Sequence, residues 1–274
     1  MKMKLTIITI NYNNREGLSH TLASVRSQRC RDFEYLVVDG GSSDGSRELI
    51  LENEDIVSSW VSEPDGGIYN AMNKGVGMAS GEYCLFLNSG DTLHSPDVVG
   101  RVLEAGLEAD IVFGRVLNVW PDGRRREYVP SQEMTLHWIM QTGIHHAGAF
   151  IRTSLMRRIP YDESLRICAD RKFFIRALVV ENCTFSTLPF LVCDFEVGGV
   201  SSTSPERVRE ESWEIMESLF PPRLVADYRK TNVRLQALTE QLVPCRNKVI
   251  GLVCAVDRFI LRVLRLLLGR RLYR

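Results

Sequence analysis

The sequence predicts an α/β fold with a mostly parallel central sheet, helices on both of its faces, and a helical C-terminal extension. Over roughly the first 110 residues, short apolar runs rich in β-branched residues alternate with segments of helical spacing, the order typical of strand–helix–strand units. A polar cluster follows three of these runs, and the pattern after residue 205 is charged and helical. We therefore expect one domain over residues 1–205 and a helical extension over residues 206–274.

The expected strands and helices alternate along the N-terminal part. Residues 5–10, LTIITI, form a continuous apolar run, which is typical of a strand buried on both faces of a parallel sheet. Further strands are expected at residues 35–38, 59–61 and 83–87, and helices at residues 17–27, 46–51, 68–78 and 98–107. After residue 110 the pattern changes, and Pro121, Asp122 and Gly123 between two strand-like runs predict a β-hairpin.

The charges are unevenly distributed along the chain. Lys and Arg total 34, as do Asp and Glu, yet residues 244–274 hold eight basic residues and one acidic residue. Arg258, Arg262 and Arg265 share one face of an expected amphipathic helix in a basic tail at about residues 248–274. Such a tail fits an anionic membrane surface; the alternative is a helix packed on the first domain or on a second subunit. No nucleic-acid partner is expected.

The cysteines and the N-terminus of the sequence predict that the protein works in a reducing compartment of the cell. The seven cysteines have no C-x-x-C spacing, which argues against a zinc site and for buried thiols in a reducing environment. The N-terminus has no secretory pattern, and no run of 18 or more residues is free of charge. We therefore expect a cytoplasmic protein that associates peripherally with the inner face of the cytoplasmic membrane.

Polar residues at the ends of three expected strands mark a candidate site. Ligands bind parallel sheets outside the carboxyl ends of the strands. Asn11 and Tyr12 follow the first apolar run, Asp39 follows the second, and residues 88–91 (NSGD) follow the fourth. Because these ends meet at one edge of the sheet, we expect the three clusters to form a single site.

The acidic members of these clusters have expected roles. A carboxylate in a tight turn, such as Asp91, can hold Mg²⁺ or Mn²⁺ because these cations complete their shell with water and substrate phosphates. The alternative is that Asp91 completes a turn or caps the next helix. Asp39 is expected to accept hydrogen bonds from a nucleobase or ribose, with an ordinary Asp-Gly turn as the alternative.

Six segments carry a family resemblance: LTIITINYNN, VVDGGSSDGS, SEPDGGIYNAMNKGVGMASG, EYCLFLNSGD, HHAGAFIRTSLM and CADRKFFIRAL. In this order and spacing, the sequence resembles the family 2 glycosyltransferases, which have the Rossmann-like GT-A fold and invert the anomeric centre. The resemblance covers residues 3–202. It implies an enzyme that uses a nucleotide-sugar and a divalent metal, Mn²⁺ or Mg²⁺.

The resemblance implies a role for each matching residue. The nucleotide contacts are Asn11, Tyr12, Asp39 and Asn88. Asp91 is matched to the metal site, and Asp170 to the general base that takes a proton from the acceptor hydroxyl. The alternative for Asp170 is an N-cap of a helix over residues 172–180. His146, Lys74 and Asp65 are candidates for acceptor or phosphate contacts; a core histidine and a solvated helix lysine are the alternatives for the first two.

The sequence departs from the family pattern at four positions. Gly40 stands where a second acid is usual, Asn88 and Gly90 replace two acids of the metal-binding turn, and Met72 replaces an arginine. Only Asp91 remains as a carboxylate in that turn, so the metal contacts are expected to be few.

The resemblance implies inverting transfer of a sugar from a nucleotide-diphosphate sugar, with a UDP-sugar favoured. The acceptor would be a hydroxyl of a glycan or a lipid-linked molecule in cell-surface polysaccharide or lipopolysaccharide synthesis. The alternative is a non-catalytic GT-A-fold partner protein, which the reduced acid count at residues 88–91 favours. A sugar nucleotidyltransferase is disfavoured because no glycine-rich, Arg-containing loop follows the first strand.

Overall fold

The structure, a computed structural model, describes residues 4–198 and 204–234. By packing, the chain divides into two compact units, Met1–Ile215 and Met216–Arg274, and the boundary falls within helix α9 (Pro205–Leu219). The expected division after residue 205 stays a prediction. The basic tail expected at about residues 248–274 lies outside the described residues.

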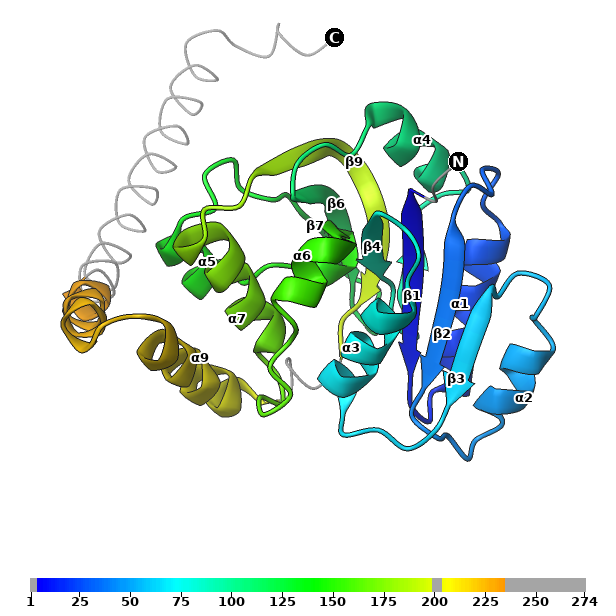
Figure 1. Ribbon diagram of the computed structural model, residues 1–274, viewed down its shortest axis with the longest axis horizontal. Helices are drawn as coiled ribbons and strands as arrows, with labels where there is room; N and C mark the ends of the chain where they lie inside the picture. Colours follow the sequence, from blue (N-terminus) through cyan, green and yellow to red (C-terminus); the bar gives the residue numbers. More distant parts are fainter. Residues whose placement is uncertain (1–3, 199–203, 235–274) are drawn as a thin grey trace, which may run out of the picture. The chain divides into compact units, whose positions relative to one another are not determined.

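One nine-stranded sheet forms the centre of the first unit (Figure 1). Its strands are β1 (Leu5–Asn11), β2 (Glu34–Asp39), β3 (Ser59–Ser62), β4 (Tyr83–Phe86), β5 (Thr92–Leu93), β6 (Ile111–Val119), β7 (Arg125–Tyr128), β8 (Ala149–Arg152) and β9 (Phe185–Glu196). They lie in the order β3-β2-β1-β4-β8-β6-β9-β5, and β7 pairs with β6.

The parallel part of the sheet is its N-terminal half. Strands β3, β2, β1 and β4 are parallel, whereas β8 runs antiparallel to both β4 and β6. Strands β6 and β9 are parallel to each other, and β6 and β7 form the predicted hairpin. The predicted α/β class is confirmed, but the sheet is mixed rather than mostly parallel, because β5, β7 and β8 pair antiparallel with their neighbours. The candidate site lies at the carboxyl ends of β1, β2 and β4, in the parallel half of the sheet.

Helices surround this sheet. They are α1 (Arg15–Arg26), α2 (Ser46–Leu51), α3 (Ile68–Met78), α4 (Val98–Ala105), α5 (Leu136–Thr142), α6 (Thr153–Arg158) and α7 (Ala169–Phe174). A 3₁₀ turn, η1 (His146–Gly148), precedes β8, and α7 continues as the π-helical η2 (Ile175–Val180). Residues 222–234 are also helical. No helix in the part of the chain that the structure describes is long and apolar enough to cross a membrane.

The alternation of side chains along β1 and β2 explains the two helical layers. Leu5 and Ile7 pack in one buried cluster with Leu18 and Leu22 of α1. Ile8 points to the other face, where its Cγ2 lies only 2.6 Å from the position of a Cβ on Gly75 of α3. Because a glycine stands there, α3 can lie directly against β1. Helices α1 and α3 therefore cover opposite faces, as predicted.

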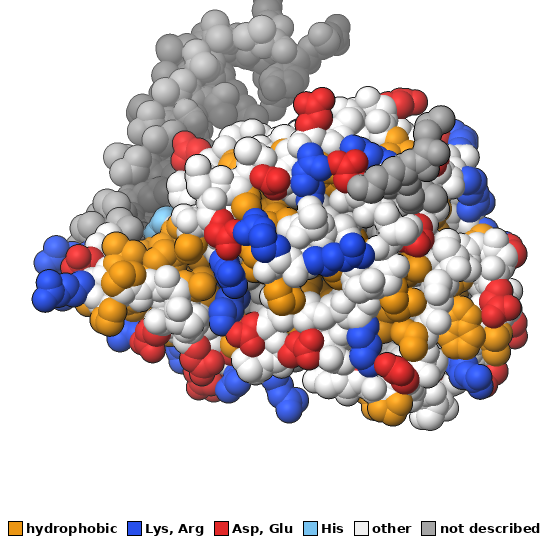
Figure 2. All heavy atoms as spheres, viewed as in Figure 1, with side chains coloured by type: hydrophobic (Ala, Val, Ile, Leu, Met, Phe, Trp, Pro, Cys, Tyr) orange, Lys and Arg blue, Asp and Glu red, His pale blue; other side chains and the backbone are white. Residues whose placement is uncertain are grey.

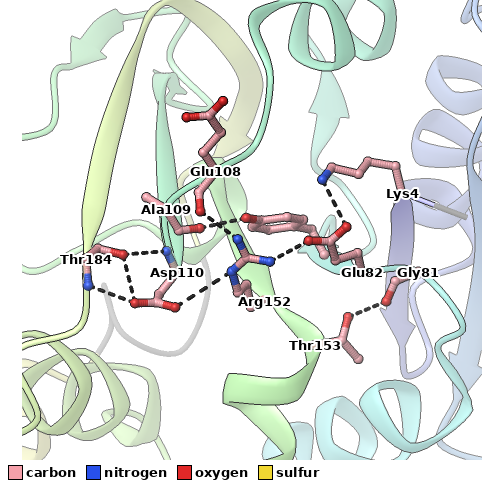
Figure 3. A network of polar contacts seen from close by, with 10 residues as sticks. Lys4, Gly81, Glu82, Glu108, Ala109, Asp110, Arg152, Thr153 and Thr184 are labelled. Atoms are coloured by element: carbon pink, nitrogen blue, oxygen red, sulfur yellow. Dashed lines mark hydrogen bonds and ion pairs between the residues drawn. The ribbon is translucent and has the colours of Figure 1, made fainter. Parts of the chain in front are cut away.

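A polar network fixes β8 at the end of the sheet away from the candidate site (Figure 3). The Arg152 guanidinium donates to the Glu82 carboxylate and, at 2.6 Å, to the Glu108 carbonyl oxygen; it lies 3.7 Å from an Asp110 oxygen. Lys4 pairs with Glu82 at 2.9 Å. These contacts join the loops before β4 and β6 to the end of β8, so they hold the antiparallel strand in register.

Charged side chains of both signs are interspersed on the face shown in Figure 2. Exposed ion pairs also form among the described residues, such as Arg26 with Asp55 at 2.5 Å and Arg29 with Asp97 at 2.9 Å. Exposed pairs of this kind contribute only about 0–1 kcal/mol each. The fold therefore depends mainly on its buried apolar cluster.

Candidate functional site

The carboxyl ends of β1, β2 and β4 meet in one hydrogen-bonded network. Asn11 and Asp39 are the last residues of their strands and pair in register. The Asn11 amide nitrogen donates to the Asp39 carboxylate at 2.7 Å, and the Ser89 hydroxyl donates to the Asn11 amide oxygen at 2.8 Å. The structure thus brings the three predicted polar clusters together.

Asp39 is a buried carboxylate that organises the loop after β2. It accepts hydrogen bonds from the hydroxyls of Ser42 and Ser62, each at 2.6 Å, and from the backbone N–H groups of Gly41 and Ser42. Burial would raise the pKa of Asp39, but hydrogen bonds from Ser42, Ser62 and Asn11 hold it below its ordinary value. A direct contact of Asp39 with a nucleobase stays a prediction, and it would compete with these protein donors.

An exposed aromatic ring and a carboxylate lie side by side beyond this network. Tyr12 is 66% exposed. A Cβ on Gly40 would lie 3.1 Å from the Tyr12 ring and 2.6 Å from an Asp65 carboxylate oxygen. A side chain at position 40, where the family usually has a second acid, would therefore require Asp65 to move. Asp65 also accepts from the Gly67 N–H at 2.8 Å, which fixes the entrance to α3.

A second cluster joins Asn88 to Asp170 through a histidine. The Asn88 amide nitrogen lies 3.1 Å from His146 Nε2, and His146 Nδ1 lies 3.5 Å from an Asp170 carboxylate oxygen. The Asn88 amide oxygen is buried and has no hydrogen-bond partner among the described residues. The His146 imidazole therefore joins Asn88 and Asp170, two predicted site residues that are 82 positions apart in sequence.

Burial sets the charges of this cluster. Asp91 is 4% exposed, and burial raises its pKa to about 7 against the opposing charge of His146. Burial would lower the pKa of His146, but its hydrogen bond to Asp170 and the charge of Asp91 raise it above the ordinary value. Near neutral pH, a cation bound beside Asp91 would displace the proton from this carboxyl group.

The oxygen atoms of Asn88 and Asp91 fit a hard divalent cation. In the described ranges, no group of three or more His, Cys, Asp or Glu side chains could hold a metal, so the protein would supply few of the ligands. The unpaired Asn88 oxygen and the Asp91 carboxylate are oxygen ligands, which Mg²⁺ and Mn²⁺ prefer. Both residues line a cavity of about 360 Å³ together with Glu196. A Cβ on Gly90 would lie 2.5 Å from the Glu196 carboxylate, which is therefore a second acid beside the turn. The remaining ligands would come from water and phosphate.

Asp170 lies inside the first turn of α7, at a second cavity of about 190 Å³ that His146 also lines. The N-cap residue of α7 is Cys168, so the alternative that Asp170 caps the helix is wrong. Its carboxylate accepts from the Arg171 N–H at 2.7 Å, and the Tyr69 hydroxyl lies 3.4 Å away. The Arg171 N–H and the Tyr69 hydroxyl thus contact the Asp170 carboxylate, and Asp170 also lines the cavity.

Lys74 is paired within the fold. Its ammonium group lies 2.8 Å from the Glu63 carboxylate and 3.5 Å from the Pro64 carbonyl oxygen. A role in phosphate binding stays a prediction, because it requires Lys74 to leave Glu63.

Sequence reasoning missed three residues that support the site. Ser42 and Ser62 donate to Asp39, and Glu196 ends the last long strand beside Asp91. A search for hydroxyls flanking Asp39 would have found Ser42, whereas nothing local to Glu196 distinguishes it from a surface residue. Ser89, which holds Asn11, belongs to the predicted NSGD cluster.

The fold and this arrangement at the carboxyl ends of β1, β2 and β4 define a GT-A-type nucleotide-sugar-dependent transferase. The family model "Glycosyl transferase family 2" matches residues 6–176. The chain belongs to this family, and it is a glycosyltransferase.

Two relatives come from mycobacteria. An uncharacterized glycosyltransferase of Mycobacterium tuberculosis is 34% identical over 213 residues, covering 72% of this chain and 77% of the relative. A PGL/p-HBAD biosynthesis glycosyltransferase of Mycobacterium bovis is 30% identical over 209 residues, covering 72% of this chain and 79% of the relative.

Solved structures share the fold. TarS of S. aureus in complex with UDP-GlcNAc has a TM-score of 0.63 at 21% identity, covering 82% of this chain and 66% of TarS 1-349. The mannosyltransferase PcManGT of Pyrobaculum calidifontis, in complex with GDP-Man and Mn²⁺, has a TM-score of 0.56 at 17% identity, covering 76% of this chain and 61% of that one. The chain thus spans less than two thirds of each of these proteins, and at these identities the likeness concerns the fold alone.

Proposed function

We propose that this glycosyltransferase inverts the anomeric centre in a single displacement, moving a sugar from a nucleotide-diphosphate sugar to a hydroxyl. The observation that carries the proposal is the chain of contacts from Asn88 through His146 to Asp170. It places an oxygen-rich turn suited to a metal–diphosphate beside a carboxylate suited to proton transfer. An in-line displacement needs both groups near one sugar carbon.

The nucleotide would lie over the ends of β1 and β2. Tyr12 offers an exposed ring for stacking on a base, and Asp65 offers a carboxylate acceptor beside it. Asn11 connects this end to the Asn88 turn through Ser89. A UDP-sugar is favoured as donor, in line with the UDP-GlcNAc that TarS binds.

Asp91 and Asn88 would hold a divalent cation, Mn²⁺ or Mg²⁺. When bound, the cation neutralises charge on the departing diphosphate. The PcManGT complex with GDP-Man and Mn²⁺ supports this for the fold. Glu196, beside Gly90, would add charge to the same turn.

Asp170 would accept the proton of the acceptor hydroxyl as that oxygen attacks. His146 orients the carboxylate from one side and the Arg171 N–H from another. The cavity beside Asp170 and His146 would receive the acceptor hydroxyl.

The acceptor is proposed to be a glycan or lipid-linked molecule of the cell surface. A mycobacterial relative is named for PGL/p-HBAD biosynthesis, which supports a biosynthetic role for this transfer. A cytoplasmic protein held at the inner membrane face by its basic tail would meet such acceptors, and the expected tail composition supports this location.

Thermal unfolding with UDP, GDP, CDP and dTDP, each with and without Mn²⁺, tests the donor site. A ligand at a hundred times its dissociation constant adds about 2.7 kcal/mol of stability. We expect a Mn²⁺-dependent rise in Tm with one nucleotide, UDP first. No rise with any of them would favour the second candidate, a non-catalytic partner of the same fold. The single carboxylate of the NSGD turn supports that candidate.

A further inference from the structure

A buried carboxylate on α9 holds the segment that leads to Asp170. Glu211 has 0% exposure. One of its oxygens accepts from the Arg166 N–H at 3.0 Å, and the other accepts from the N–H groups of Ile167 at 3.0 Å and Cys168 at 2.9 Å. Three consecutive backbone donors thus converge on one side chain from a helix some 40 residues further along the chain.

A carboxylate suits this position better than any neutral side chain. It has two acceptor oxygens and no donor, so it can satisfy three N–H groups and the Arg207 Nε, which donates to it at 3.0 Å. Burial would raise the pKa of Glu211, but the backbone N–H groups and Arg207 keep it below the ordinary value. An amide here would turn an NH₂ group toward at least one backbone donor.

The same segment is held from a second direction. The Tyr69 hydroxyl of α3 donates to the Ile167 carbonyl oxygen, so Ile167 is bound at both its N–H and its C=O. On α9, the Ser212 hydroxyl accepts from the Arg171 guanidinium, one residue after Asp170. Asp170 follows Cys168, the N-cap of α7, by two residues, so its position depends on these contacts.

We propose that Glu211 is a positioning residue: by holding residues 166–168 from α9, it sets the place of the Asp170 carboxylate against His146. The inference rests on the proposed role of Asp170 as base. It also makes the part of α9 up to Ile215 belong to the catalytic unit, in keeping with a packing boundary that falls after Ile215.

The test compares Glu211→Gln with Glu210→Gln. Glu210 lies on the same helix with a 62% exposed side chain, and its carboxylate is 3.7 Å from Arg207. Three quantities are measured: hydrogen exchange of the amides of residues 166–168, the affinity for UDP with Mn²⁺ by calorimetry, and kcat for UDP release from UDP-GlcNAc. If Glu211→Gln does not fold, Glu211→Asp, which keeps the charge but is shorter by one methylene, takes its place.

We expect faster exchange at residues 166–168 and a fall in kcat on the order of 10- to 100-fold, the cost of a displacement of about 1 Å. UDP affinity should stay within about twofold, because the Asp39 network contacts none of these residues, and Glu210→Gln should match the wild type. Unchanged kcat, unchanged exchange, or a parallel loss of kcat and UDP affinity would each overturn the proposal. A wild-type protein without UDP release or transfer contradicts the proposed function, whereas equal rates in active wild type and Glu211→Gln contradict only the role of Glu211.

Discussion

Replacing Asp39 with Asn changes one atom in the most densely bonded carboxylate of the site. Asp39 accepts five hydrogen bonds, and two of them come from the backbone N–H groups of Gly41 and Ser42 at one oxygen. If the NH₂ group of Asn takes the place of that oxygen, both N–H groups lose their acceptor. A buried donor without a partner costs about 1–3 kcal/mol. Because Gly41 is exposed and Ser42 only partly buried, water replaces part of what is lost, and the expected destabilisation is about 1–3 kcal/mol, or a fall in Tm of about 2–12 °C for a protein of this size.

Circular dichroism melts of Asp39→Asn, wild type and Asp32→Asn measure this effect; Asp32 is exposed and serves as the control. The pKa of Asp39 is lowered in the fold, so the carboxylate contributes stability above the unfolded value of about 4 and loses it as pH falls through the folded pKa. The difference between wild type and Asp39→Asn should therefore shrink below about pH 4. A fall in Tm of less than about 2 °C at pH 7 would refute the reasoning, because it would mean that the two N–H groups had found other partners.

Three further perturbations test other parts of the structure. Arg152→Met keeps an unbranched apolar stem but lacks the guanidinium, so it removes the contacts to Glu82 and Asp110. We expect a loss of about 1–3 kcal/mol in urea unfolding with UDP affinity unchanged, and a loss of binding would show that the network reaches the site. Burial raises the pKa of Asp91 to about 7, so in EDTA the free energy of unfolding should fall progressively as pH rises from about 4 to 7. Asp91→Asn should remove this dependence, and identical pH profiles of the free energy of unfolding in wild type and variant would contradict the reasoning. Tyr12→Ala should weaken UDP binding by about 1–3 kcal/mol through lost stacking, measured by calorimetry, without lowering Tm because the ring is exposed.

The sequence predicted where the polar strand ends meet, because the signals for it are local. Apolar runs over β1, β2 and β4 end in polar residues, and the rule that ligands bind at the carboxyl ends of parallel strands placed Asn11, Asp39 and Asn88 together. The hairpin of β6 and β7 was likewise predicted from its Pro-Asp-Gly turn and is confirmed.

The cluster of His146 and Asp170 depends on contacts that no local pattern reveals. Strand β8 was not predicted, yet its antiparallel insertion beside β4 brings His146 to Asn88. Glu211 reads as an ordinary charged residue of an exposed helix, and only the packing of α9 shows that it is buried. Such partners arise from tertiary packing between segments far apart in sequence, which periodicity cannot report.

The central claim is that Asp170 is the base of a glycosyl transfer whose donor binds at a separate end of the site. Asp170→Asn keeps the side-chain size but is not basic, so we predict a fall in transfer rate of about 100-fold or more, consistent with general base catalysis. The affinity for the nucleotide with Mn²⁺ should stay within about twofold. An unaltered transfer rate in Asp170→Asn, measured beside the wild type with the same donor and acceptor, would contradict the account.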